Sequence, residues 1–108
     1  MALTKLEYTF QNVTPAGMKR EWSHTGVVGS GDLEVLMERQ EPADQVRFQV
    51  VTPVKGFEEV WEGVLERFAR ESAVGGVSFE IHDNNATPFV VRLRLRQALE
   101  EAGGKEDE

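Results

Sequence analysis

The chain has 108 residues, no cysteine and a formal net charge of −7, and 40% of its residues are hydrophobic. This length fits one compact domain with a single core, and the negative charge argues against binding to nucleic acids or anionic membranes, which need clustered Lys and Arg. Without cysteine, disulfides and thiolate zinc sites are excluded, and any thiol chemistry must come from an added group.

The N-terminal part of the chain shows the alternation of a strand. Residues 2–11 carry apolar side chains at every second position, which is the period of a half-buried strand. Residues 12–20 contain proline and glycine without sustained periodicity and predict a loop. Residues 21–28 are a candidate second strand.

A tight bend is predicted at residues 29–32, which read Gly-Ser-Gly-Asp. Its glycines can adopt backbone angles that are closed to other residues, so the bend should expose Ser30. Alternation resumes over residues 33–38 and again over residues 46–50, on either side of a turn at residues 41–44. These two segments predict the strands of a hairpin.

The clearest helix covers residues 57–68, where apolar residues fall at the i, i+3, i+4, i+7 spacing of one helical face and Glu and Arg occupy the other. Two glycines at 75–76 end this segment. Alternation over residues 77–82 then predicts a strand, which stops at the turn-forming Asp-Asn-Asn of residues 83–85.

Two patterns compete near the C-terminus. Thr87 followed by Pro88 resembles a helix cap with proline at the first helical position, which favours a helix. Strict alternation of apolar residues with arginines over residues 91–96 favours a strand. We predict a strand over residues 89–96, a short helix over residues 97–102 and a flexible acidic tail over residues 103–108.

Together these elements predict the fold class. Four to six short strands and one strong amphipathic helix are typical of an α+β domain, in which the helix covers one face of a mainly antiparallel sheet. The short C-terminal helix is a further candidate element. We expect this domain to occupy residues 1–102.

The glycine-rich segment at residues 26–31 matches neither the G-x-G-x-x-G pattern nor a P-loop, so nucleotide binding is not predicted. A Gly-Ser-Gly bend taken alone is most often only a turn. The residues around the bend are more informative than the bend itself.

Three segments resemble the acyl carrier, or delta, subunit of malonate decarboxylase. They are Val-Gly-Ser-Gly-Asp-Leu-Glu-Val-Leu at residues 28–36, Val-Val-Thr-Pro-Val at residues 50–54 and Ile-His-Asp-Asn-Asn-Ala-Thr-Pro at residues 81–88. Their order and spacing are similar to that family over about residues 25–101. The Leu-Glu-Ser-Ser-Asp of citrate lyase carriers and the Asp-Ser-Leu of fatty-acid carriers are absent.

The resemblance implies that Ser30 carries 2′-(5″-triphosphoribosyl)-3′-dephospho-CoA, covalently bound through a phosphodiester, with Gly29, Gly31 and Asp32 as the context of the attachment bend. The thiol of this cofactor would hold acetyl and malonyl thioesters, and the carrier would itself catalyse nothing. The partners implied are the acyl-carrier transferase and decarboxylase subunits of malonate decarboxylase, a malonyl transferase and the prosthetic-group transferase.

Two other functions stay open: a citrate lyase-type acyl carrier, and a small adaptor that binds a partner without any prosthetic group. An independent enzyme is disfavoured, because no nucleophile, base and orienting group can be named together. His82 and Asp83 lack convergent ligands, so no metal site is predicted.

Charged residues near these motifs have more than one candidate role. Asp32 can orient Ser30, accept a hydrogen bond from the backbone of the bend, or contact a basic residue of a partner. Arg92, Arg94 and Arg96 are equally compatible with contacts to phosphates or an acidic partner and with ion pairs to the many glutamates.

No basic N-terminal segment precedes an apolar run, and no stretch approaches the ~20 apolar residues of a membrane span. The negative charge and the hydropathy pattern therefore both argue against an association with membranes. We expect a cytoplasmic protein that binds neither membranes nor nucleic acids.

Overall fold

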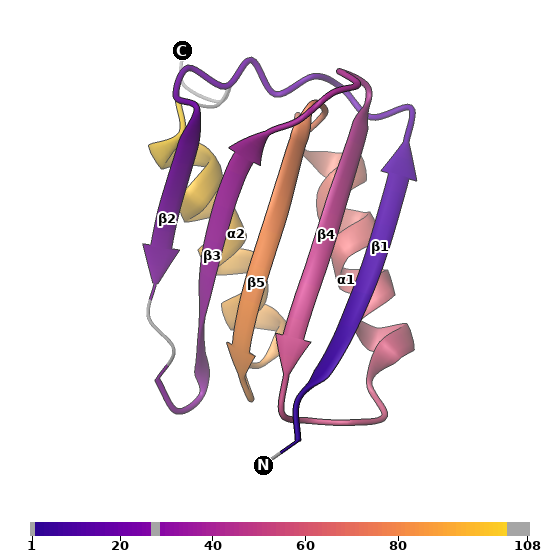
Figure 1. The fold of residues 1–108 in the computed structure, drawn as a ribbon, viewed down its shortest axis with the longest axis vertical. Coiled ribbons are helices and arrows are strands. Elements are labelled where there is room, and N and C mark those ends of the chain that lie inside the picture. The colour runs from indigo at the N-terminus through magenta and orange to yellow at the C-terminus, as the bar shows by residue number, and fades with distance from the viewer. Residues whose placement is uncertain (1, 27–28, 104–108) are drawn as a thin grey trace.

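The structure, a computed structural model, describes residues 2–26 and 29–103, and in this part of the chain five strands form one sheet with two helices packed on the same face (Figure 1). In chain order the elements are β1 (Thr4–Gln11), β2 (Trp22–Gly26), β3 (Asp32–Arg39), β4 (Gln45–Thr52), α1 (Glu58–Glu71), β5 (Val77–Asn84) and α2 (Pro88–Glu101). The predicted α+β class is confirmed. The predicted end of the second strand, at residues 27–28, and most of the predicted tail, at residues 104–108, lie outside the described residues.

The strands lie in the order β1-β4-β5-β3-β2. Three of the pairings are antiparallel, and β4 pairs with β5 in parallel. Parallel neighbours need a crossover that returns the chain to the end of the sheet where the first strand began, and α1 supplies it. Both β4 and β5 therefore finish at the same end of the sheet. Both helices begin at this end, and the turn between β2 and β3 lies there too (Figure 1).

The predicted hairpin is wrong. The segments at residues 33–38 and 46–50 are strands, but β5 lies between β3 and β4, antiparallel to the first and parallel to the second. Alternation shows that a segment can cover one face of a sheet, but it carries no information on which strand becomes its neighbour.

The predicted C-terminal strand is also wrong, because residues 89–96 belong to the single helix α2. The helix begins as the competing pattern indicated: the Thr87 side chain accepts a hydrogen bond from the Val90 amide at 3.3 Å, and Pro88 occupies the first turn, where its missing N–H leaves no partner unsatisfied. The predicted short helix over residues 97–102 is the end of this longer one.

Burial along α2 explains why the alternation was misleading. Val91, Leu95, Ala98 and Leu99 are buried at the i, i+4, i+7, i+8 spacing of a helix. Leu93 stands two positions from Leu95 in the alternating row, yet its side chain is 41% exposed on the outer face. The alternation thus combines one buried face of the helix with residues from its solvent side.

The core lies between the sheet and the two helices. The Phe48 and Phe79 rings stack across the parallel strands with centroids 4.9 Å apart, and the Phe68 ring of α1 meets Phe79 edge-on at 6.0 Å. Such aromatic contacts add to the stabilisation that comes from burying large apolar side chains. They fasten α1 over the β4–β5 pair. Trp61 is buried in the same layer, as its place on the apolar face of the helix predicts.

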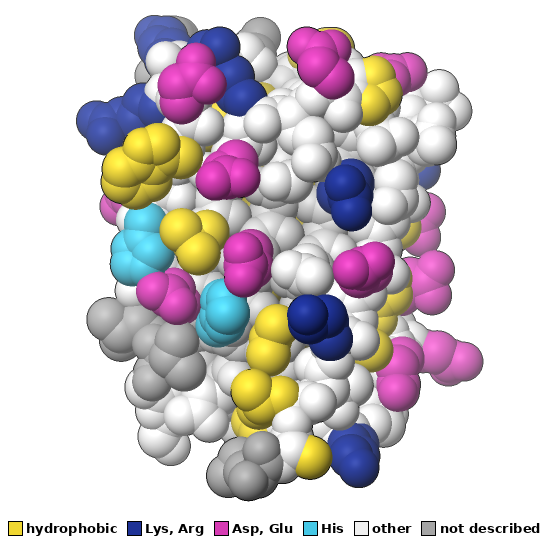
Figure 2. All heavy atoms as spheres, viewed as in Figure 1, with side chains coloured by type: hydrophobic (Ala, Val, Ile, Leu, Met, Phe, Trp, Pro, Cys, Tyr) yellow, Lys and Arg dark blue, Asp and Glu magenta, His cyan; other side chains and the backbone are white. Residues whose placement is uncertain are grey.

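The opposite face of the sheet is open and carries charged side chains of both signs and both histidines (Figure 2). His24 Nε2 lies within hydrogen-bonding distance of Glu34 Oε2, and His82 Nε2 lies 2.9 Å from Glu80 Oε2. Neither helix in the described part of the chain is long and apolar enough to cross a membrane.

Two leucines of α2 should differ sharply in their contribution to stability. Leu95 is fully buried, so Leu95→Ala should lower the free energy of unfolding by about 2–5 kcal/mol. Leu93→Ala, on the outer face, should change it by no more than about 0.5 kcal/mol. Urea denaturation of the two variants measures the difference, and equal losses would contradict the helix.

Candidate functional site

The turn at residues 29–32 joins β2 to β3. The Asp32 amide donates a hydrogen bond to the Gly29 carbonyl at 3.0 Å, which closes the turn, and the Gly31 amide donates to the carbonyl of Asn84, at the end of β5, at 2.8 Å. Ser30 lies at the tip and is exposed, as the sequence predicts. The turn is therefore short, closed within itself and attached to a central strand.

Gly31 is needed for backbone geometry. Its φ of +76° lies in the left-handed region that L side chains rarely adopt. Within the described part of the chain, a Cβ atom built at Gly31 would have no neighbour within 4 Å beyond the two adjoining residues, so open space lies beside Ser30. Gly29, on the other side, is half-buried.

Gly26 closes the strand pair just before the turn. Its φ is +88°, and a Cβ atom there would lie 2.3 Å from the Leu33 carbonyl oxygen. Only glycine lets β2 and β3 approach this closely. Sequence reasoning treated Gly26 only as part of a rejected phosphate-loop pattern, since no local signal marks a close contact between strands.

Asp32 links the turn to α2. Its carboxylate accepts two hydrogen bonds from the Arg94 guanidinium, from Nε at 2.9 Å and from Nη2 at 2.6 Å. The same carboxylate accepts a hydrogen bond from the Leu33 amide at 2.7 Å. The side chains of Arg94 and Asp32 are 27% and 22% exposed. One of the three predicted roles of Asp32, acceptance of a backbone hydrogen bond, is thus observed together with an ion pair inside the chain.

This ion pair shifts the acidity of both partners. The hydrogen bonds from Arg94, followed by the bond from the Leu33 amide, hold the pKa of Asp32 below its ordinary value. The hydrogen bonds to Asp32, together with its negative charge, raise the pKa of Arg94. Both groups are consequently charged at neutral pH.

The two other arginines of the row are placed differently. Arg92 lies 3.6 Å from Glu71, at the end of α1, so ion pairing within the chain accounts for it as well as for Arg94. Arg96 is exposed. Because the segment is a helix and not a strand, these three side chains do not share one face.

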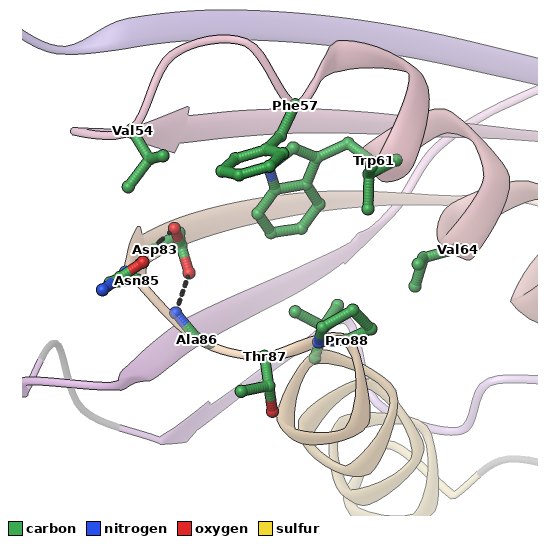
Figure 3. Close-up of a pocket in the computed structure, with 11 residues that line it drawn as sticks. Val54, Phe57, Trp61, Val64, Asp83, Asn85, Ala86, Thr87 and Pro88 are labelled. Carbon is green, nitrogen blue, oxygen red and sulfur yellow. Dashed lines mark hydrogen bonds between the residues drawn. The ribbon is translucent and has the colours of Figure 1, made fainter.

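Asp83 has a structural role at the end of β5. It is buried and accepts hydrogen bonds from the Thr52 hydroxyl at 2.8 Å and the Asn85 amide at 3.1 Å. It also accepts one from the Ala86 amide at 2.9 Å (Figure 3). These contacts join the ends of β4 and β5 and lead the chain into α2. The residues that the structure describes include no group of three side chains placed to hold a metal ion.

An apolar groove of about 350 Å³ opens between the first turns of α1 and α2 (Figure 3). Phe57 and Val60 contribute partly exposed side chains from α1, while Ala86 and Pro88 line the facing wall. The groove lies at the end of the sheet where the turn with Ser30 is also found. Sequence reasoning missed it, because the groove forms only when residues more than twenty positions apart meet.

The two glycines beside the turn should respond differently to substitution. A positive φ costs an L-residue about 1–2 kcal/mol, which applies to both Gly26→Ala and Gly31→Ala. Only at Gly26 would the new methyl group also collide with a carbonyl oxygen, that of Leu33. Gly26→Ala should therefore destabilise the fold more in chemical denaturation. Equal losses would contradict the close approach of β2 and β3.

An acid titration should measure the contribution of Asp32. Because its folded-state pKa is lowered, the stabilisation is complete above the ordinary value of 3.8 and is lost as the pH falls through the folded-state pKa. The wild type should exceed Asp32→Asn in free energy of unfolding at about pH 7, and the difference should shrink towards about pH 2. Urea denaturation across this range gives the result, and a constant difference would argue against the ion pair.

Comparison with known proteins places this geometry in a family. The family model of the malonate decarboxylase delta subunit (MdcD) matches residues 20–102. The chain is 50% identical over 104 residues to a malonate decarboxylase acyl carrier protein of Malonomonas rubra, covering 96% of this chain and 93% of that protein. It is 42% identical over 97 residues to the protein of the same name from Acinetobacter calcoaceticus, covering 90% and 94%.

A solved structure agrees with these relatives. One chain in the crystal structure of a Pseudomonas malonate decarboxylase hetero-tetramer in complex with malonate superposes with a TM-score of 0.81 at 40% identity, over 93% of this chain and 99% of that one. Similarity of sequence and of fold extends over nearly the whole length of both. The chain therefore belongs to the malonate decarboxylase delta subunit family.

Proposed function

We propose that the chain is the acyl carrier subunit of a malonate decarboxylase and that Ser30 is the covalent attachment point of its prosthetic group. The chain is a carrier and not a catalytic subunit, in keeping with its family and its named relatives. The observation that carries the proposal is the exposed position of Ser30 at the tip of a turn that is hydrogen-bonded within itself and to β5.

The surroundings of Ser30 fit a bulky group. A transferase must bring a large phosphorylated donor to the hydroxyl, and small neighbours leave room for its approach. Gly31 has open space where a side chain would stand, and Asp32 is held by Arg94 on the helix side of the turn. The residue that would anchor the group is Ser30, with Gly29 and Gly31 as its small neighbours.

We infer that the group derives from 2′-(5″-triphosphoribosyl)-3′-dephospho-CoA and is attached to Ser30 Oγ through a phosphodiester, with the other two phosphates lost as pyrophosphate. When bound, it supplies a thiol that holds acetyl and malonyl groups as thioesters, a function for which this chain without cysteine has no side chain of its own. A fixed anchor and a long flexible arm let one site serve several active centres at high effective concentration. Ser30 needs no neighbouring base or oxyanion hole for this role.

The expected partners follow from this role. The related Pseudomonas chain was solved within a malonate decarboxylase hetero-tetramer. For this chain we propose contacts with the acyl-carrier transferase and decarboxylase subunits, with a malonyl transferase and with the prosthetic-group transferase, in the cytoplasm. The carrier domain would comprise residues 1–102, followed by the acidic tail.

Mass spectrometry of the protein from its native host tests the anchor. The wild-type chain should carry the mass of the arm, peptide mapping should place it on Ser30, and Ser30→Ala should remain unmodified and leave the complex inactive. Ser78→Ala, a half-buried serine on the open face of the sheet, is the control and should be modified normally.

Two outcomes would contradict this proposal. The adduct can lie on a residue other than Ser30, or the complex with Ser30→Ala can keep full activity. The second result would favour an adaptor without a prosthetic group. Thermal unfolding of both serine variants confirms that the fold is intact.

A further inference from the structure

We propose that the Asp32–Arg94 ion pair positions the attachment turn for modification of Ser30. The inference rests on the proposed role of Ser30 as the anchor. It assigns a function to Arg94, which lies 62 positions from Asp32 in the sequence. Arg94 acts through Asp32 and is a positioning residue, not a catalytic one.

The ion pair adds a side-chain restraint to a turn that is otherwise held by backbone hydrogen bonds. The Gly31 amide bonds Asn84 and the Asp32 amide bonds Gly29, which fixes the turn to β5 and to itself. Arg94 adds a connection to α2, on the helix-covered side of the sheet. Because Asp32 is two residues from Ser30, a restraint on Asp32 leaves little freedom at the serine.

The geometry of the pair restrains orientation as well as distance. Two parallel hydrogen bonds between a planar guanidinium and a carboxylate leave little rotational freedom. A third guanidinium nitrogen, Nη1, donates to Gln97 Oε1 at 2.9 Å, one turn further along α2. Both charged side chains are about three-quarters covered, so solvent and salt screen them less than a surface pair.

Gly26 makes room for this arrangement. A Cβ atom at Gly26 would lie 3.5 Å from Cδ of Arg94, so the aliphatic stem of the arginine runs past the end of β2. The stem therefore lies against the strand that leads into the turn. Contact with both strands and with the turn makes Arg94 a common support for them.

A direct contact between Arg94 and the phosphates of the donor is the competing role. Nε and Nη2 are occupied by Asp32 and Nη1 by Gln97, so each guanidinium nitrogen already donates a hydrogen bond within the chain. The Asp32 carboxylate also neutralises the charge of the arginine. Two of the five guanidinium N–H groups remain for a further acceptor, but the two parallel bonds to Asp32 and the neutralised charge favour the positioning role.

In the modification, Ser30 Oγ forms a bond to the phosphorus nearest the ribose in the triphosphate of the donor. The anhydride bond to the next phosphorus breaks, pyrophosphate leaves with the bonding electrons, and the serine proton passes to a base of the transferase. A turn without its restraint populates the reactive conformation less often. Apparent affinity falls in proportion to that population, so the KM for the unmodified carrier should rise while kcat changes little.

The test uses full-length unmodified carrier made in a host without the transferase, then incubated with purified transferase and donor while intact mass is followed. The variants are Arg94→Gln, Asp32→Asn, the double variant and Arg94→Lys, which keeps the charge but loses the two parallel hydrogen bonds. Arg92→Gln is the matched control, because Arg92 lies on the same helix and pairs with Glu71.

Each single variant should raise the KM for the carrier about fivefold to tenfold, and the double variant no further, because the two residues act through one another. Arg94→Lys should fold like the wild type without restoring the KM, and Arg92→Gln should behave like the wild type. Hydrogen exchange of the Gly31 amide should accelerate in the Asp32 and Arg94 variants but not in Arg92→Gln, since the bond of this amide to Asn84 opens more often.

Three results would overturn the inference. A wild-type KM for Arg94→Gln would show that the pair does not matter for modification. Impairment of Arg94→Gln but not of Asp32→Asn would indicate direct binding of donor phosphates. A raised KM with unchanged amide exchange would show that the variants impair modification without loosening the turn. An adduct on a residue other than Ser30 would instead refute the anchor, and the exchange data would still report whether the pair restrains the turn.

Discussion

Parallel pairing of β4 with β5 is the constraint on which the rest of the molecule depends. It requires the α1 crossover, which the stacked Phe48 and Phe79 rings and the edge-on Phe68 ring hold against the sheet. It also places the C-terminal ends of both strands at one end of the sheet. The first turns of both helices and the turn between β2 and β3 lie at that end (Figure 1), and the apolar groove opens between the helix starts.

This end of the sheet combines rigid support with the exposed Ser30, which we propose as the anchor. Asp83 joins the end of β5 to β4 and to the start of α2, while Asn84 and Arg94 hold the turn from two sides. A carrier needs its flexibility in the arm and not in the protein, because a fixed anchor keeps the arm within reach of its partners. The hydrogen bonds around Ser30 meet this requirement without supplying any catalytic group.

Local patterns predicted most strands and the first helix, because alternation and helical spacing report directly which side chains face a core. They failed where one stretch of sequence fits both the two-residue period of a strand and the 3.6-residue period of a helix. In α2, Leu93 and Leu95 look equivalent in the alternating row, and only packing against β2 and β3 buries one and leaves the other exposed. The Thr87-Pro88 cap was the better signal there, since it marks a helix start independently of burial.

The sequence by itself determined the family resemblance, the exposed Ser30 bend, the α+β class and the absence of a cysteine thiol, because each of these follows from neighbouring residues or from composition. Only the tertiary structure decided the insertion of β5 between β3 and β4, the groove, the close approach at Gly26 and the pairing of Asp32 with Arg94. These features join residues that are distant in the chain. Their geometry is decided by which faces bury one another, and that information is not local.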